Sequence, residues 1–171
     1  EATYSVVLPD RMYGGPRGIY KKVNEGLASG LAELGAEVSV AVGGVALSPD
    51  AGPCFRVPAP GEVMAQGRKL VGSAQVRLGS SVLQHGSIML AGDQSLLASL
   101  GGGVDDTAPP ATLVSLIGEI DGDDLAEALT RGLKLALGGD WSDGAYRSGE
   151  IAEADWLEKE RYTTDEWTWS K

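Results

Sequence analysis

The sequence predicts an α+β fold, a mixed and largely antiparallel β-sheet packed with helices. Segments with the two-residue alternation of strands lie mainly in residues 1–90, whereas most of the segments with helical periodicity follow them. Strands followed by helices, rather than a regular strand–helix alternation, are typical of α+β layers. The chain has 171 residues, the length of one domain with a substantial core. We therefore expect a single domain over residues 1–171.

The first elements are a strand, a helix and a second strand. Thr3–Leu8 is predicted to be a strand that ends at Pro9-Asp10. Ile19–Leu34 is predicted to be a helix because its apolar residues form one stripe, and Gly35 follows as a stop signal. Glu37–Val42 alternates briefly and predicts a short strand. The stripe of the helix consists of Ile19, Val23, Leu27, Leu31 and Leu34.

Two further segments around a Ser-rich turn predict an antiparallel hairpin. The turn is Leu78-Gly79-Ser80-Ser81. Gly72 and Gly86, inside the two strands, mark a place where a ligand or another backbone approaches closely. The residues alone leave open an ordinary hairpin with one solvated face. With a period of two, one face of the first strand carries Lys69, Val71, Ser73, Gln75 and Arg77.

The rest of the chain predicts mostly helices. The segment Asp123–Leu137 aligns leucines at four-residue spacing and ends at Gly138-Gly139. Ser148 is a plausible N-cap for the last long helix. The predicted elements are short helices at Ser95–Leu100 and Ala111–Glu119, longer helices at Asp123–Leu137 and Ser148–Arg161, and a short aromatic cap at Thr163–Trp169.

The composition of the chain argues against several classes of function. The net charge is −10, and all of it falls in residues 104–171, because acidic and basic side chains balance in residues 1–103. This acidity argues against nonspecific nucleic-acid binding. No apolar run approaches the roughly 20 residues that span a bilayer, and no secretory signal opens the chain. A single Cys excludes an internal disulfide framework and fits a cytoplasmic location. A single Cys and a single His also argue against a zinc site, which needs about four such ligands.

A block of residues in the middle of the chain carries a family resemblance. Gly67–Leu90 has the sequence GRKLVGSAQVRLGSSVLQHGSIML, and Cys54-Phe55 lies just upstream. This pattern resembles the lipoate/octanoate protein ligase and transferase family, whose catalytic domain is of the biotin/lipoate A/B ligase type. The Cys-Phe pair resembles the pattern of the cysteine-dependent octanoyltransferases rather than that of the ATP-dependent ligases. The resemblance extends more loosely from Thr3 to Trp167.

The resemblance implies roles for individual residues. Cys54 would be the nucleophile, because a thiolate forms readily near cationic groups and gives a reactive thioester. Lys69 would face the acyl head group and stabilise charge that develops during attack. His85 would either move a proton or serve as a hydrogen-bonded structural histidine. The residues expected to bind the acyl substrate are Gly72, Ser73, Ala74, Gln75, His85 and Gly86.

The implied activity is an octanoyltransferase of lipoate biosynthesis that needs no cofactor. Its donor would be an acyl carrier protein, and its acceptor a lipoyl-domain or glycine-cleavage H-type protein. A locally basic group (Arg56, Arg68, Lys69 and Arg77) would suit an acidic donor, although ordinary surface charge gives the same pattern. Three alternatives stay open: an ATP- and Mg-dependent lipoate ligase, an amidotransferase between lipoylated proteins, and a noncatalytic acyl-binding module.

The start of the chain suggests a further expectation. Residues Glu1–Ser5 already lie in the first predicted strand, which leaves a sheet edge without its expected neighbours. The resembling enzymes carry an Arg-Arg and Gly-Gly-rich segment upstream of this strand. We therefore expect residues 1–171 to be the C-terminal portion of a longer domain.

Overall fold

The computed structural model describes residues 1–43, 60–93 and 109–170. The chain forms two compact units, Glu1–Gly139 and Asp140–Lys171. The predicted nucleophile Cys54, the nearby Arg56 and the predicted helix Ser95–Leu100 lie outside the described residues.

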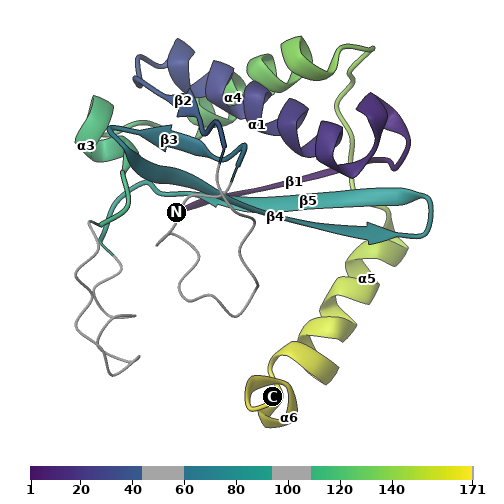
Figure 1. Ribbon diagram of the computed structural model, residues 1–171. Coiled ribbons are helices and arrows are strands. Elements are labelled where there is room, and N and C mark those ends of the chain that lie inside the picture. Colours follow the sequence, from purple (N-terminus) through teal and green to yellow (C-terminus); the bar gives the residue numbers. More distant parts are fainter. Residues whose placement is uncertain (44–59, 94–108, 171) are drawn as a thin grey trace. The chain divides into compact units, whose positions relative to one another are not determined.

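The first unit is built on a five-stranded sheet in the order β1-β5-β4-β3-β2 (Figure 1). Every neighbouring pair of these strands is antiparallel, which confirms the predicted antiparallel sheet. The predicted hairpin is also confirmed, as β4 and β5. The predicted strand at residues 37–42 is reduced to two residues, and β3 was not predicted. The strands are β1 (Ala2–Pro9), β2 (Ser39–Val40), β3 (Val63–Ala65), β4 (Arg68–Leu78) and β5 (Ser81–Ile88).

Two long helices lie on the same side of this sheet, α1 (Pro16–Glu33) and α4 (Gly122–Leu137) (Figure 1). Both were predicted. The helix predicted at residues 111–119 is shorter, α3 (Leu113–Ile117), and a 3-10 turn (Met12–Gly14) precedes α1. Asp121 caps α4, since its carboxylate accepts a hydrogen bond of 2.8 Å from the Asp123 N–H.

The core lies between α1 and the sheet. Four of the five residues in the predicted apolar stripe of α1 are buried, and the fifth, Leu34, is partly buried and packs against the same core. Burial of such large aliphatic side chains contributes about 1.5–3 kcal/mol for each one. The buried core residues of α1 and of the hairpin are Ile19, Val23, Leu27, Leu31, Leu70, Val71, Val82 and Ile88.

Glycines allow α1 and α4 to approach each other backbone to backbone. A Cβ at Gly132 would lie 2.2 Å from the Gly26 carbonyl oxygen and 2.5 Å from the Gly30 nitrogen. Both of these contacts are to main-chain atoms, which cannot rotate away. The helices must therefore separate if a side chain is added at this crossing.

We accordingly expect Gly132→Ala to destabilise the protein by about 1–3 kcal/mol, the usual cost of overpacking. The gain of about 1 kcal/mol in helix propensity acts in the opposite direction. Gly122→Ala is the matched control in the same helix, because a Cβ there meets nothing within 4 Å. Urea unfolding of both variants measures the difference, and equal stability of the two would contradict a close helix crossing.

The second unit contains α5 (Ser148–Leu157), a π-helical turn (Glu158–Tyr162) and α6 (Asp165–Thr168). The prediction that Ser148 is the N-cap was wrong: Ser148 is the first helical residue and Arg147 occupies the cap position. The Glu150 carboxylate accepts a hydrogen bond of 2.7 Å from the Arg147 N–H, so the backbone donor is satisfied by a side chain from within the helix.

An aromatic cluster lies near the C-terminal end of this unit. The Arg161 guanidinium lies 4.7 Å from the ring centre of Trp167 and 5.4 Å from that of Tyr162. The two rings meet edge to face, with their centres 4.9 Å apart. Across the described ranges of both units, no helix combines the length and apolarity needed to cross a membrane.

Candidate functional site

The register of β4 and β5 divides the predicted substrate-binding residues between two faces of the sheet. Ser73 pairs with Gly86, and Gln75 pairs with Gln84. Directly opposed residues point to the same face, and Gln84, which is buried and donates to Asn24 of α1, identifies this face as the one under α1. Ala74 pairs with His85, and Gly72 pairs with Ser87, so these residues belong to the opposite face. Ala74 and His85 are exposed there.

The alternation that predicted a shared face for Lys69 and Ser73 is interrupted by a β-bulge. Val63 of β3 lies opposite Val71, but the next residue, Met64, lies opposite Lys69. Leu70 is therefore an extra residue in β4. A bulge of this kind bends the strand and re-aims the neighbouring side chains, and it is common beside active sites. The orientation of Lys69 consequently does not follow from that of Ser73.

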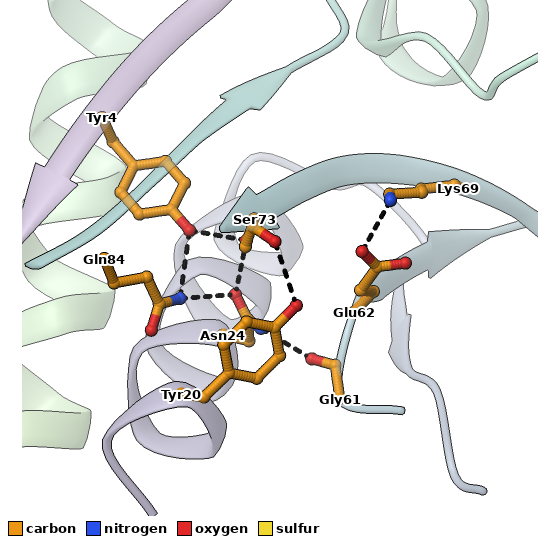
Figure 2. A network of polar contacts seen from close by, with 8 residues as sticks. All are labelled: Tyr4, Tyr20, Asn24, Gly61, Glu62, Lys69, Ser73 and Gln84. Atoms are coloured by element: carbon orange, nitrogen blue, oxygen red, sulfur yellow. Dashed lines mark hydrogen bonds and ion pairs between the residues drawn. The ribbon is translucent and has the colours of Figure 1, made fainter. Parts of the chain in front are cut away.

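Lys69 forms a buried ion pair with Glu62, the residue before β3. The Lys69 Nζ lies 2.6 Å from the Glu62 Oε1, and the two side chains are only 6% and 4% exposed (Figure 2). Buried charges persist in proteins only when they are paired and hydrogen-bonded, because desolvation of each one is costly. Lys69 is therefore a fixed positive charge inside the protein and not a surface lysine.

A network of polar side chains lies beside this pair, between α1 and the hairpin (Figure 2). The Tyr4 hydroxyl is 2.6 Å from the Ser73 hydroxyl, which donates a 3.1 Å hydrogen bond to the Asn24 Oδ1. The Gln84 Nε2 donates to the Tyr4 hydroxyl at 3.1 Å and to the Asn24 Oδ1 at 3.3 Å. Among the described residues, every buried side-chain nitrogen and oxygen has a hydrogen-bond partner. This network therefore fixes its members in one arrangement.

The network reaches the ion pair through the main chain of Gly61. The Asn24 Nδ2 donates a 2.8 Å hydrogen bond to the Gly61 carbonyl oxygen. Gly61 has a φ of 87°, in the left-handed region that favours glycine. A Cβ at this position would also lie 3.2 Å from the Tyr20 ring. Glycine at position 61 therefore permits the backbone conformation in which the residue bonded to Asn24 is followed directly by Glu62.

Burial and the nearby Glu62 carboxylate affect two tyrosines of this region. Desolvation, and to a lesser extent the negative charge of Glu62, raises the pKa of Tyr20 to about 12 from its usual 10.0. Desolvation also raises the pKa of Tyr4. Both phenols therefore remain neutral hydrogen-bonding groups when exposed tyrosines begin to ionise.

These shifts predict a loss of stability at alkaline pH. In the unfolded chain Tyr20 releases its proton near pH 10, whereas the folded protein retains it up to about pH 12. The unfolded state then binds fewer protons, so the free energy of unfolding decreases as pH rises through this window. Urea unfolding between pH 9 and pH 11 should show a weaker decrease in Tyr20→Phe than in the wild type. Identical slopes for the two proteins would contradict a buried, neutral Tyr20.

Gly86 is explained by a close approach within the protein. Tyr4 of β1 lies directly opposite Gly86, and a Cβ at Gly86 would be 2.7 Å from a Tyr4 ring carbon. It would also be 2.3 Å from the carbonyl oxygen of Gly72. The close neighbours of Gly86 are therefore a tyrosine ring and another strand. The glycine signal in the sequence does indicate a close approach.

The other predicted residues have individual surroundings. The His85 Nδ1 is 3.2 Å from the Ser5 hydroxyl, on the face opposite the polar network. The Gln75 Nε2 donates to the Pro16 carbonyl at 3.1 Å and lies 3.4 Å from the Gln84 Oε1. Arg77 pairs at the surface with Asp10, at 2.5 Å. The structure thus brings Ser73 and Gln75 into the polar network, and leaves Gly72, Ala74 and His85 on the other face.

Sequence reasoning did not identify five members of this site: Tyr4, Tyr20, Asn24, Glu62 and Gln84. Asn24 carried a usable signal, because it is a polar residue beside the apolar stripe of a predicted helix. Glu62 carried none, since its partner Lys69 is brought to it by a strand pairing that was not predicted. Within the described ranges, no group of three or more His, Cys, Asp or Glu side chains is arranged to hold a metal ion.

Residues 1–130 match the family model of the lipoyl protein ligase A/B catalytic domain. The chain belongs to this family.

Among the curated relatives are octanoyltransferases named LipM. The relative from Kyrpidia tusciae is 34% identical over 190 aligned positions, which cover 100% of this chain and 69% of the relative. The relative from Moorella thermoacetica is 48% identical over 95 positions, covering 53% of this chain and 35% of its own length. The chain thus spans about two thirds of the Kyrpidia relative and matches a shorter part of the other.

A solved structure shows the same fold. The bipartite lipoate protein ligase of Thermoplasma acidophilum, studied with its E2 lipoyl domain, superimposes with a TM-score of 0.66 at 19% identity. The match covers 96% of this chain and 62% of the archaeal chain. This likeness confirms the α+β, ligase-type fold that the sequence predicted.

Proposed function

We propose that this protein is a cytoplasmic octanoyltransferase of lipoate biosynthesis. It takes the octanoyl group from an acyl carrier protein and places it on a lysine of a lipoyl-domain or glycine-cleavage H-type protein. The observation that carries the proposal is the 34% identity to an octanoyltransferase LipM along the whole of this chain. The bipartite ligase with its E2 lipoyl domain supports a protein acceptor of the same kind.

The proposed transfer runs in two steps through Cys54. The Cys54 thiolate attacks the thioester carbonyl of the donor, and the carrier sulfur departs as a thiolate as the enzyme thioester forms. The acceptor lysine amine then attacks that thioester, releases the Cys54 thiol and loses a proton as the amide forms. A thioester remains reactive enough for this second step, so neither ATP nor Mg is required.

Lys69 supplies the electrostatic part of the mechanism. An ammonium has three N–H donors, so pairing with Glu62 is compatible with a hydrogen bond to an acyl oxygen. A fixed charge in a water-poor site stabilises developing negative charge more effectively than a mobile charge in water. The position of Lys69 at the β-bulge, and its 6% exposure, support this assignment.

The acyl chain is assigned to the face of the sheet that carries Gly72, Ala74 and His85. Gly72 and Ala74 have the smallest side chains of β4, and Ala74 is exposed. Ser73 and Gln75 use their polar groups in the network under α1, and Gly86 lies beneath the Tyr4 ring. In this proposal these last three residues support the strands that carry the site.

A comparison of donors tests the proposed function. The full-length protein is incubated with a lipoyl-domain acceptor and one of three donors: octanoyl carrier protein, octanoylated H-type protein, or free octanoate with ATP and Mg. Mass measurement of the acceptor is expected to show octanoylation from the carrier protein without ATP. Modification only with free octanoate and ATP would instead establish a ligase, and modification only from the H-type protein would establish an amidotransferase. Binding of octanoate without any transfer would indicate an acyl-binding module.

A further inference from the structure

We infer that Glu62 is a positioning residue for Lys69, and that Asn24 of α1 holds Glu62 in place through the Gly61 carbonyl. This inference rests on the role proposed for Lys69 in acyl transfer. It connects Asn24, inside α1, to the end of the substrate that reacts, through Glu62 and Lys69.

Hydrogen bonds to its main chain hold the segment Gly61-Glu62. The Asn24 Nδ2 donates to the Gly61 oxygen at 2.8 Å. The Ala41 N–H donates to the Glu62 oxygen at 2.8 Å, and the Gly61 N–H donates to the Ala41 oxygen at 2.9 Å. The peptide unit that carries the Glu62 side chain is therefore fixed on both sides, by a helix and by the segment that follows β2.

Asn24 is itself fixed in one orientation. Its side chain is fully buried, and its Oδ1 accepts hydrogen bonds from the Ser73 hydroxyl and from the Gln84 Nε2. These two donors determine which end of the amide is the oxygen, so the Nδ2 must face the Gly61 carbonyl. The polar network thus sets the direction of the hydrogen bond from Asn24 of α1 to the Gly61-Glu62 segment.

The position of Glu62 determines the position of the Lys69 ammonium. The Lys69 stem is long and flexible, and the 2.6 Å ion pair with Glu62 helps to locate its charged end. A displacement of about 1 Å at a reacting centre can lower the rate about a hundredfold. A small movement of Gly61 is therefore expected to reduce transfer even though Gly61 and Asn24 do not contact the substrate in this proposal.

Asn24→Asp removes the critical bond with little change in shape. The aspartate keeps an oxygen for Ser73 and Gln84, but it replaces the Nδ2 donor by an oxygen that repels the Gly61 carbonyl. Glu62→Gln removes the charge that holds Lys69. The matched control is Tyr13→Phe, which loses another hydrogen bond from a side chain to a main-chain carbonyl, the 2.5 Å bond to Leu137. Urea unfolding of all three variants separates a loss of stability from a loss of activity.

Steady-state kinetics of the full-length protein with octanoyl carrier protein provide the first readout. We expect Asn24→Asp and Glu62→Gln to lower kcat about a hundredfold, with KM for the donor unchanged, whereas Tyr13→Phe retains wild-type kcat. A fall in kcat and kcat/KM by the same factor identifies an interaction made in the transition state. Wild-type kcat in Asn24→Asp, or an equal loss in the control at equal stability, would overturn the inference.

The second readout does not depend on activity. In protein labelled with 15N-lysine, the ammonium signal of Lys69 is identified by its absence in Lys69→Ala. We expect this signal to exchange slowly with water in the wild type and in Tyr13→Phe, and to shift or broaden in Asn24→Asp. An unchanged signal in Asn24→Asp would refute the positioning chain, whether or not the protein transfers octanoate. A perturbed signal in a protein without transferase activity would instead refute only the proposed function.

Discussion

Replacement of Lys69 by alanine is expected to lower octanoyl transfer by about two or more orders of magnitude. The loss of one preorganised charge stabiliser in an acyl-transfer site commonly has an effect of this size. The same change leaves the Glu62 carboxylate buried without its cation, and breaking such a pair typically costs about 3–5 kcal/mol of stability. Rates and urea unfolding should therefore be measured on the same preparation, under conditions in which the variant is folded.

Lys69→Arg is the informative companion to this variant. Arginine retains the positive charge, but its planar guanidinium is no substitute for a compact ammonium in a tight site. We expect it to recover part of the stability, because Glu62 regains a cation, and little of the activity. Near-normal transfer by either folded variant would show that Lys69 is a structural ion-pair residue without a part in the reaction.

Replacement of Cys54 by serine is expected to reduce transfer from the carrier protein about a thousandfold or more, in the range seen when a nucleophile is removed. Serine has nearly the same shape as cysteine, but its hydroxyl ionises far less readily than a thiol. A separate variant, His85→Ala, distinguishes the two roles left open for the histidine. Retained stability with reduced transfer would indicate that His85 moves a proton during the reaction. Full transfer by Cys54→Ser with free octanoate and ATP would establish the ligase alternative.

Local sequence patterns predicted most of the large elements of the fold. The apolar stripe of α1 and the four-spaced leucines of α4 are buried or partly buried against the core, because helix amphipathicity is a property of neighbouring residues. The predicted hairpin appears as β4 and β5 because its strand alternation and its turn are also patterns of neighbouring residues. The three-residue strand β3 could not be predicted, since so short a segment acquires its conformation from its partners.

The arrangement of the site was only partly predictable. Lys69 was identified as a candidate from its motif, but strict alternation placed it on one face with Ser73. The bulge at Leu70 changes that relation, and it arises from pairing with β3, which is separated from β4 by a turn. Glu62 was not identified because it meets Lys69 only through the pairing of β3 with β4, and Asn24 was not identified because its contact with Gly61 joins residues that are distant in sequence. Such contacts become visible only when the strands and helices have been assembled.

A pulse–chase measurement of intact mass is the most direct test of the proposed octanoyl relay. The full-length protein is first incubated with octanoyl carrier protein alone, and the acceptor lipoyl domain is then added without ATP. We expect one octanoyl group on the enzyme, located on Cys54 by peptide mapping and labile to hydroxylamine, which moves to the acceptor lysine during the chase. Octanoylated acceptor formed by an enzyme that never carries the group on Cys54 would contradict the account.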